Sequence, residues 1–514
     1  MTRPLDERSP VFVIGAGIMG AGIAQVAAQA GHPVQLYDAR EGAAADAKRK
    51  LAASLDALVM KGRLAPEFVQ ATVTRITPAM AIDDAAGAHL VVEAIVEQAE
   101  TKRALFAQLE AVVDADCVLA SNTSSISITA LARDLQRPGR FVGMHFFNPV
   151  PLMKLVEVVS GLQTEPAVAQ AIFGLAERWS KTPVHARSTP GFIVNRIARP
   201  YYAETLALLQ ERAAEPAVLD ACLRGAGFRM GPCELMDLIG HDTNFAVTAS
   251  VHEANFGDRR FVPSLVQREL VDGGLLGRKS GRGFYVHAER TTTSLATPPA
   301  ASAVALPSAA RWRVHGHGAL VERWLEGLAR EGRAFERVED SAWSGLELDD
   351  AQLRQTDGRP AAQVAAETAV RDVALFDRAG TTEPAGSGSA LAWSASGGAT
   401  EAWQARAAQC LQAAGWQPLR LRDVPGLVVA RTLAMLINEA SDAVLQGVCS
   451  APDADLAMKL GVNYPAGPFE WLARWDARQV VALLDRLDAH YRGERYRASP
   501  ALREQAWLQE ARTT

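Results

Sequence analysis

Residues 11–20 read VFVIGAGIMG, and this stretch decides the fold of the first part of the chain. Its four leading apolar residues are typical of a buried parallel strand. They run straight into the glycine pattern of 15–20, and the small residues of 21–30 then favour a helix. Strand, G-x-G-x-x-G and helix in this order predict a dinucleotide-binding turn in a Rossmann-type α/β domain with a mostly parallel, doubly wound sheet.

Each residue of the turn has a physical task. Gly15 permits a tight bend, and Gly17 lets the backbone approach a pyrophosphate. Gly20 lets the helix pack closely on the strand, while Ile18 and Met19 at the helix start offer backbone N–H groups to the phosphates. We therefore expect all five residues to contact the cofactor.

A carboxylate then selects the form of the cofactor. Asp38 follows the second expected strand, 34–37, and comes 18 residues after Gly20. At this place an aspartate accepts both ribose hydroxyls and repels a 2′-phosphate. NAD is therefore expected in preference to NADP, and Arg40 is the nearby feature that favours NADP.

Three more short apolar runs, 90–92, 117–120 and 141–144, predict further parallel strands. Each run leads into polar residues, and ligands of open α/β sheets bind outside the carboxyl ends of the strands. We expect one crevice to collect these polar side chains: Glu93, Glu97, Ser121-Asn122-Thr123-Ser124-Ser125 and His145.

Within this set, His145 stands in the run MHFFNP (144–149), and Glu157 lies on the next expected strand. An imidazole titrates near neutral pH and can take the proton of an alcohol. A carboxylate that accepts the other ring hydrogen would fix the tautomer and stabilise the imidazolium. Beside a nicotinamide, such a pair oxidises a secondary alcohol. In the alternative interpretation His145 merely ends a buried strand and Glu157 is a solvated charge, and the pair alone does not decide between the two.

A helical stretch over 42–61 carries four cations, Lys48, Arg49, Lys50 and Lys61. Two interpretations fit this pattern. The cations form a solvated helix face, or the helix is an arm that meets the phosphates of a large acyl carrier such as coenzyme A.

Beyond the chain-breaking residues 189–192 the pattern becomes helical. A helix is predicted over 193–210, with Asn195 in its first turn as either a cap or a donor to a substrate carbonyl. A turn into another short helix is expected at 230–242. The basic stretch 277–285 either lies over cofactor phosphates or is simply exposed.

Composition narrows the class of protein. The chain has 514 residues and a net charge of −5, so it predicts several globular domains and no nucleic-acid partner. The five cysteines are dispersed without metal-ligand spacing, which favours reduced thiols in the cytoplasm and no metal. No apolar run approaches the ~18–20 residues needed to span a bilayer, and the first ten residues do not resemble a signal peptide.

The second half is predicted to be a degenerate copy of the first. Residues 404–431 parallel 169–196, with Pro425-Gly426 against Pro190-Gly191. The segment 314–331 is typical of a decayed strand, glycine turn and helix. Three features indicate lost chemistry: Val321 replaces the third glycine, no acid follows a good second strand, and Ala430 stands at the position of Asn195.

We therefore expect five segments. They are an NAD-binding Rossmann domain (8–188), a helical substrate and association domain (189–287), a linker (288–311), a degenerate Rossmann-like segment (312–422) and a second helical domain (423–514).

Residues 11–286 resemble the L-3-hydroxyacyl-CoA dehydrogenase family. The matching strings occur in family order: GAGIMGAGIAQ, VVEAIVE, SNTSSI, GMHFFNPVPLMKLVEVV, TPGFIVNR, MGPCELMDLIG and GRKSGRGFY. The resemblance implies oxidation of a (3S)-3-hydroxyacyl-CoA to a 3-oxoacyl-CoA with NAD. The chain departs from the family pattern at Arg187-Ser188-Thr189, Cys233 and His241, none of which has a catalytic role there.

The resemblance also implies roles for individual residues. His145 is the expected base, Glu157 orients it, and Ser124 and Asn195 hold the substrate oxygens. The remaining implied contacts are with NAD for Asp38, Glu97, Lys102, Ser124, Asn148 and Lys279, and with the CoA moiety for Ser54 and Lys61.

The tandem length is similar to that of bacterial members that act on 3-hydroxyadipyl-CoA in phenylacetate breakdown, or on 3-hydroxybutyryl-CoA or other short chains in fatty-acid metabolism. A dicarboxylic substrate would need a cation, for which Arg196, Arg199, Arg224 and Arg229 are candidates. The helical domains are expected to associate, within the chain or as a homo-dimer or trimer. A sugar-acid dehydrogenase and a non-catalytic NAD-binding protein, such as the lens members of the family, are the competing classes.

Overall fold

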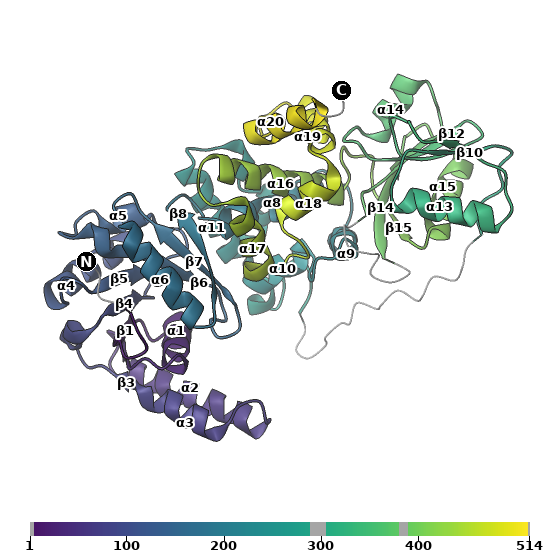
Figure 1. Ribbon diagram of the computed structural model, residues 1–514. Coiled ribbons are helices and arrows are strands. Elements are labelled where there is room, and N and C mark those ends of the chain that lie inside the picture. The colour runs from purple at the N-terminus through teal and green to yellow at the C-terminus, as the bar shows by residue number, and fades with distance from the viewer. Residues whose placement is uncertain (1–4, 288–304, 380–388, 512–514) are drawn as a thin grey trace. The chain divides into compact units, whose positions relative to one another are not determined.

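The computed structural model describes residues 5–287, 305–379 and 389–511 (Figure 1). Most of the predicted linker, residues 288–304, lies outside the described residues. The chain divides into two compact units. Unit 1 comprises Met1–Arg196 and Gln446–Val462, and unit 2 comprises Ile197–Leu445 and Asn463–Thr514.

A mostly parallel sheet forms the centre of unit 1. Its strands are β1 (Val11–Ile14), β2 (Val34–Tyr37), β3 (Ile76–Pro78), β4 (Leu90–Glu93), β5 (Val118–Ser121), β6 (Phe141–Phe146), β7 (Leu155–Ser160) and β8 (Thr182–Arg187). They lie in the order β3-β2-β1-β4-β5-β6-β7-β8. Only the β6–β7 pair among these neighbours is antiparallel. The predicted Rossmann-type fold is confirmed.

The strands of this sheet are buried because helices cover both faces. β1, β4, β5 and β6 are buried along their whole length, which explains their continuous apolar runs. The helices of unit 1 are α1 (Ile18–Gln29), α2 (Ala43–Met60), α3 (Pro66–Arg75), α4 (Ala99–Val112), α5 (Ile128–Ala132), α6 (Pro166–Arg178), α7 (Val194–Ile197, whose last residue begins unit 2) and α17 (Ala451–Gly461).

Two local features differ from the sequence prediction. The helix expected over 42–61 is α2, and α3 packs beside it to make a helical pair that projects from the sheet (Figure 1). The helix expected over 193–210 is broken at Ala198, because α8 (Arg199–Gln210) starts anew with Pro200 in its first turn.

A segment of the second half belongs to unit 1. Helix α17 packs against β7 and β8, and the Arg187 N–H donates to the Val448 carbonyl at 2.8 Å. The packing is tight at Gly461, where a Cβ atom would come within 2.7 Å of the Leu155 side chain. Only glycine fits between this strand and the end of α17.

Unit 2 contains both helical domains. Its helices there are α8 (Arg199–Gln210), α9 (Pro216–Gly225), α10 (Pro232–Ile239), α11 (His241–Ala254), α12 (Leu265–Asp272), α16 (Val429–Leu445), α18 (Pro468–Trp475), α19 (Ala477–Tyr491) and α20 (Pro500–Glu510). Helix α8 packs against α16, its counterpart in the repeat, and a buried ion pair joins Glu204 to Arg431 at 2.9 Å. The predicted repetition therefore produces an internal pairing of equivalent helices.

Unit 2 also holds the second sheet. Its strands are β9 (Trp312–His315), β10 (Glu336–Val338), β11 (Gly345–Leu348), β12 (Ala351–Gln355), β13 (Val373–Phe376), β14 (Ala390–Ala395) and β15 (Gln417–Arg420), and its helices are α13 (Ala319–Arg330), α14 (Ala361–Thr368) and α15 (Glu401–Ala413). The strand order is β10-β9-β11-β12-β13-β14-β15.

The second sheet corrects one sequence prediction. Strand β10 pairs in parallel with β9, just as β2 pairs with β1, and Glu339 follows β10 directly. An acid therefore does follow the second strand, 18 residues after Val321. The sequence hid it because β10 is short and half exposed rather than apolar. Among the helices of the described residues, none is long and apolar enough to cross a membrane.

Candidate active site

The strand ends of unit 1 bring His145 and Glu157 together. They face each other on the antiparallel strands β6 and β7, and His145 Nδ1 lies 2.6 Å from Glu157 Oε2. Glu157 is fully buried and His145 is 6% exposed. With a proton on Nδ1 that is donated to the carboxylate, the ring keeps Nε2 as its acceptor. This is the arrangement that a proton-accepting imidazole requires.

The start of α7 fixes the carboxylate. Glu157 Oε1 accepts the N–H groups of Ile193 and Val194 at 3.0 and 2.9 Å. These are orphan donors at a helix start, and the carboxylate satisfies them. Phe147 and Phe192 flank the imidazole, with ring centroids 4.5 and 5.9 Å away. Both partners of the pair are thus held rigidly.

Ser124 and Asn195 also meet in unit 1. Asn195 Nδ2 donates to the Ser124 carbonyl at 3.4 Å, which places the amide beside the loop after β5. A further residue, Asn122, was not predicted to have a role of its own. Its Oδ1 accepts the Phe146 N–H at 2.8 Å and so ties this loop to the strand that carries His145.

Glu97 organises the same loop. Its Oε1 accepts the Ser124 N–H at 2.8 Å and the Thr123 hydroxyl at 2.7 Å. Burial alone would raise the pKa of Glu97, but Lys102 and these hydrogen bonds outweigh it and lower the pKa. Glu97 is therefore an anion that holds the Ser124 backbone in place.

Lys102 lies beneath the loop rather than at its surface. It is 1% exposed, and its Nζ lies 2.5 Å from Glu93 Oε1 and 3.2 Å from Glu97 Oε2. Glu93 is fully buried and also accepts the Ser121 hydroxyl at 2.6 Å. The prediction that Glu93 lines the crevice is therefore wrong, because this carboxylate neutralises a buried lysine.

The glycine turn fits a dinucleotide. A Cβ on Gly20 would lie 1.7 Å from the Gly15 carbonyl oxygen, whereas a Cβ on Gly17 would meet nothing within 4 Å. Helix α1 starts here without a side-chain cap, so its first N–H groups remain available to phosphates. A cavity of about 830 Å³ adjoins the turn and is lined by Gly15, Gly17, Asp38 and Arg40 among others.

Asp38 stands at the end of β2, where the sequence predicts the ribose contact. Its Oδ2 accepts the Ala16 N–H at 2.8 Å, and its Oδ1 lies 3.1 Å from Arg40 Nε. Burial raises the pKa of Asp38, but the bonds from Arg40 and Ala16 outweigh it and lower the pKa. A charged carboxylate therefore faces the cavity.

The other predicted contact residues form no hydrogen bond or ion pair with His145 or Glu157 within the described part of the chain. Asn148 is exposed just beyond β6, and Ser54 and Lys61 are exposed on α2 and at its end. Lys279 belongs to unit 2 and lies in the short 3-10 helix η4 (Arg278–Ser280). It forms an ion pair with Asp242 of α11. Within the described chain, no group of His, Cys, Asp and Glu is placed to hold a metal ion.

Comparisons with known proteins identify the family of this chain. Residues 10–189 match the NAD binding domain of 3-hydroxyacyl-CoA dehydrogenase, and residues 191–287 and 426–512 both match its C-terminal domain. Residues 353–425 match the 3-hydroxybutyryl-CoA dehydrogenase reduced Rossmann-fold domain. The two C-terminal domain matches confirm the predicted duplication of the helical domain.

Relatives extend over the whole chain. The 3-hydroxyadipyl-CoA dehydrogenase of Escherichia coli K12 is 44% identical over 97% of this chain and 98% of its own. The mitochondrial hydroxyacyl-coenzyme A dehydrogenase of Sus scrofa is 42% identical over 54% of this chain and 90% of its own.

A crystal structure of 3-hydroxybutyryl-CoA dehydrogenase from Escherichia coli K12 superposes with a TM-score of 0.86. It is 43% identical and covers 98% of this chain and 99% of its own. The chain therefore belongs to the 3-hydroxyacyl-CoA dehydrogenase family and is an NAD-dependent oxidoreductase.

Proposed function

We propose that the enzyme oxidises 3-hydroxyadipyl-CoA at C3 and that His145 is the base of this reaction. The observation that carries the proposal is the buried His145–Glu157 pair, whose carboxylate is itself held by the start of α7. The substrate follows from the Escherichia coli relative of that name, which matches this chain over nearly its full length.

In the proposed reaction, bound NAD supplies the hydride acceptor. His145 Nε2 takes the proton of the C3 hydroxyl, and Glu157 stabilises the imidazolium that results. Asn195 and Ser124 lie together and are proposed to orient the substrate oxygens. Glu97, which holds the Ser124 backbone and is buttressed by Lys102, is proposed to position this loop beside the cofactor.

The remaining binding residues keep their predicted roles in the proposal. The glycine turn, Asp38 and Asn148 contact NAD, as does Lys279. Ser54 and Lys61 on the exposed α2 arm contact CoA.

A substrate panel tests the proposal. The full chain is mixed with NAD and either 3-hydroxyadipyl-CoA or 3-hydroxybutyryl-CoA, and NADH formation gives kcat/KM for each. We expect turnover of both and a higher kcat/KM for the dicarboxylic thioester. The second candidate substrate is 3-hydroxybutyryl-CoA, favoured by the name of the superposed crystal structure. A higher kcat/KM for the C4 thioester would select it.

We further propose a cytoplasmic enzyme in which the second half replaces a partner subunit. The cysteines are unpaired thiols, which fits a reducing compartment. The internal α8–α16 pairing occupies a helical surface that would otherwise be exposed. Deletion of residues 291–514 is expected to lower solubility or change subunit association, and an unchanged, active monomeric fragment would refute the role. Any homo-dimer or trimer is proposed to form through other helical surfaces.

A further inference from the structure

Two adjoining cavities open at one edge of the second sheet, inside unit 2. Their volumes are about 640 and 420 Å³. Both are lined by the same central residues: His317, Ser344, Gln355, Arg378, Trp475 and Gln479. The edge is formed by the carboxyl ends of β9, β12 and β13, and α18 and α19 form the opposite wall. In an open α/β sheet this is the edge where ligands bind.

A glycine turn forms one wall. Helix α13 starts at Ala319 without a side-chain cap, directly after Gly318. A Cβ on Gly318 would meet nothing within 4 Å, as at Gly17 in the first sheet. Gly318 has a φ of +133°, a backbone conformation that residues other than glycine rarely adopt. The Gly316 and His317 N–H groups donate to the Val338 carbonyl and the Ser344 hydroxyl, so the uncapped N–H groups are those at the start of α13, beside Gly318.

Arg378 brings a positive charge to the same place. Its guanidinium stacks on the ring of Trp475 at 4.2 Å, and it forms no ion pair with any carboxylate of the described residues. The neighbouring Asp377 is committed elsewhere, since its carboxylate accepts the N–H groups of residues 428–430. Burial lowers the pKa of Arg378 to about 10, which leaves it charged at neutral pH. A half-buried cation of this kind attracts an anion from solution.

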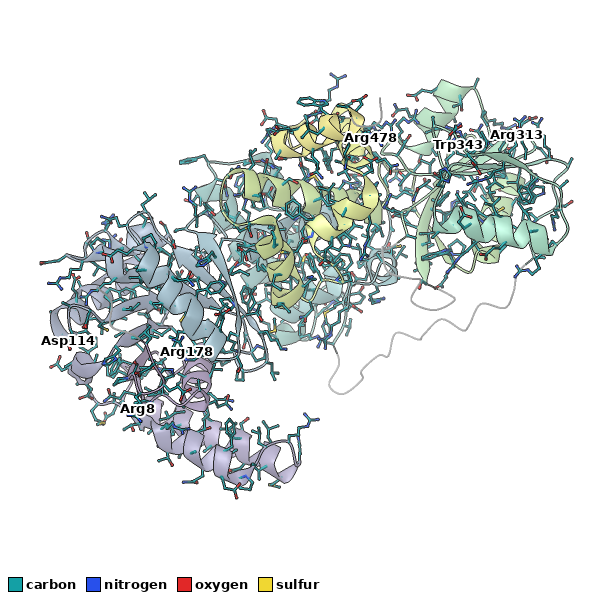
Figure 2. The ribbon with its side chains drawn as sticks, in the orientation of Figure 1. Arg8, Asp114, Arg178, Arg313, Trp343 and Arg478 are labelled. Carbon is teal, nitrogen blue, oxygen red and sulfur yellow. The ribbon has the colours of Figure 1, made fainter. Side chains whose placement is uncertain are left out.

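The other charged residues of the lining include two arginines that are paired with its two aspartates. Arginines 378, 474, 478 and 486 line the cavities, against only Asp357 and Asp476 among the carboxylates of the lining. Arg478 pairs with Asp476 at 2.6 Å, and Arg486 pairs with Asp357 at 3.0 Å. Figure 2 shows Arg478 and Trp343, which belong to the same lining. Two indole rings and three glutamine amides complete a surface suited to an organic anion.

This site differs from the NAD crevice of the first sheet. That crevice lies between the glycine turn and the end of β2, and Asp38 lines it. The cavities of the second sheet lie on the β12–β13 side of the turn, and Glu339 after β10 is not among their lining residues. A ligand here would not be seated as NAD is expected to be in the first sheet.

We propose that these cavities bind a diphosphate-bearing ligand, whose phosphates lie between the start of α13 at Gly318 and Arg378. Nucleotides and coenzyme A share this group, and the structure favours the group rather than either carrier.

Calorimetry on the full chain without added NADH tests the proposal, because NADH carries a diphosphate and would compete for these cavities. Pyrophosphate, ADP and coenzyme A are titrated separately. We expect at least one of them to bind. Arg378→Gln should weaken that binding about tenfold or more, since it removes a hydrogen-bonded charge. Gln479→Glu, at an exposed position of the lining, should weaken it as well.

Arg420→Gln is the matched control, because Arg420 also stacks on a tryptophan, Trp393, but does not line the cavities. It should leave binding unchanged. Tighter binding of ADP or of coenzyme A than of pyrophosphate identifies the carrier. The proposal is overturned if no probe binds, if Arg420→Gln weakens binding as much as Arg378→Gln, or if both cavity variants bind like the wild type.

Discussion

The seven strands of the second sheet lie in the same order as strands β2-β1-β4-β5-β6-β7-β8 of the first sheet, but the two sheets differ in what their strand ends carry. In the first sheet, His145 on β6 faces Glu157 on β7. In the second, the register of β13 and β14 brings Asp377 opposite Ala392, and the Asp377 N–H donates to the Ala392 carbonyl at 2.9 Å. Asp377 therefore stands where His145 does, and Ala392 where Glu157 does.

The difference separates a structural task from a chemical one. Glu157 accepts N–H groups at the start of α7, and Asp377 accepts those at the start of α16. Both sheets thus keep a buried carboxylate at a helix start, where orphan donors need an acceptor. Only the first sheet adds an imidazole that can carry a proton away from a substrate. The helix cap alone is enough to maintain the fold of the second sheet.

The largest expected effect comes from breaking this pair at the histidine. His145→Ala should lower kcat by about 10²–10⁴-fold, because general-base catalysis contributes that much. Steady-state NADH formation with a 3-hydroxyacyl-CoA measures it. A change confined to KM would contradict the assignment.

Glu157→Gln should lower kcat by roughly 10²-fold, because the amide can no longer stabilise an imidazolium. The variant keeps the shape of the side chain, so far-UV circular dichroism should match that of the wild type. A variant with full kcat would show that Glu157 serves only as a helix cap, as Asp377 does.

The buried ion pair between Glu204 of α8 and Arg431 of α16 predicts an effect on the free energy of unfolding. Burial alone would raise the pKa of Glu204, but Arg495 and Arg431 outweigh it and hold the pKa below its ordinary value. Glu204→Gln should therefore lower the free energy of unfolding by about 2 kcal/mol or more at neutral pH, since it removes the buried carboxylate that pairs with Arg431 and Arg495.

The pH dependence follows from the direction of that shift. A carboxyl group with a lowered pKa in the folded chain contributes stability that is complete above the unfolded value, ~4.3, and is lost as the pH falls through the folded value. In urea unfolding, the wild type should have a higher free energy of unfolding than Glu204→Gln, and this difference should shrink below about pH 4. Exposed Glu339→Gln is the control and should change little. If the difference in free energy of unfolding between the wild type and Glu204→Gln were the same at all pH values, the proposed dependence on the Glu204 pKa would be contradicted.

The smallest effect concerns the acids that follow the second strand of each sheet. Asp38→Asn should raise KM for NAD about tenfold with little change in kcat. It should also reduce the ratio of kcat/KM for NAD to kcat/KM for NADP. Glu339→Gln, at the matching place in the second sheet, should leave KM for NAD unchanged. Equal effects of the two variants would mean that the second sheet also takes part in cofactor binding.

Local patterns were enough to predict most strands of the first sheet, but β8 was not predicted, and the pairing of His145 with Glu157 was one of two interpretations until the family resemblance favoured it. Buried parallel strands leave continuous apolar runs, and the polar residues that follow them mark the carboxyl edge. His145 and Glu157 stand out because both are polar within such runs. Strand β3 was not predicted, because Ile76-Thr77-Pro78 is too short to show a hydrophobic pattern.

Long-range partners could not be predicted in the same way. Glu93 ends strand β4 and Lys102 lies in helix α4. Only the structure shows that these two charged residues form an ion pair in the interior. Likewise, nothing local in residues 446–462 indicates that they pack on β7 and β8 of the first sheet. Such contacts depend on the tertiary arrangement rather than on spacing.

One measurement tests most directly whether proton transfer belongs to the first sheet alone. The kcat of Asp377→Asn is compared with those of the wild type and His145→Ala in the same assay, with folding checked by thermal unfolding. Asp377→Asn should stay within about twofold of the wild type, because its one amide oxygen still accepts some of the backbone N–H groups and no chemistry passes through it. A folded Asp377→Asn enzyme that loses kcat as His145→Ala does would contradict the account.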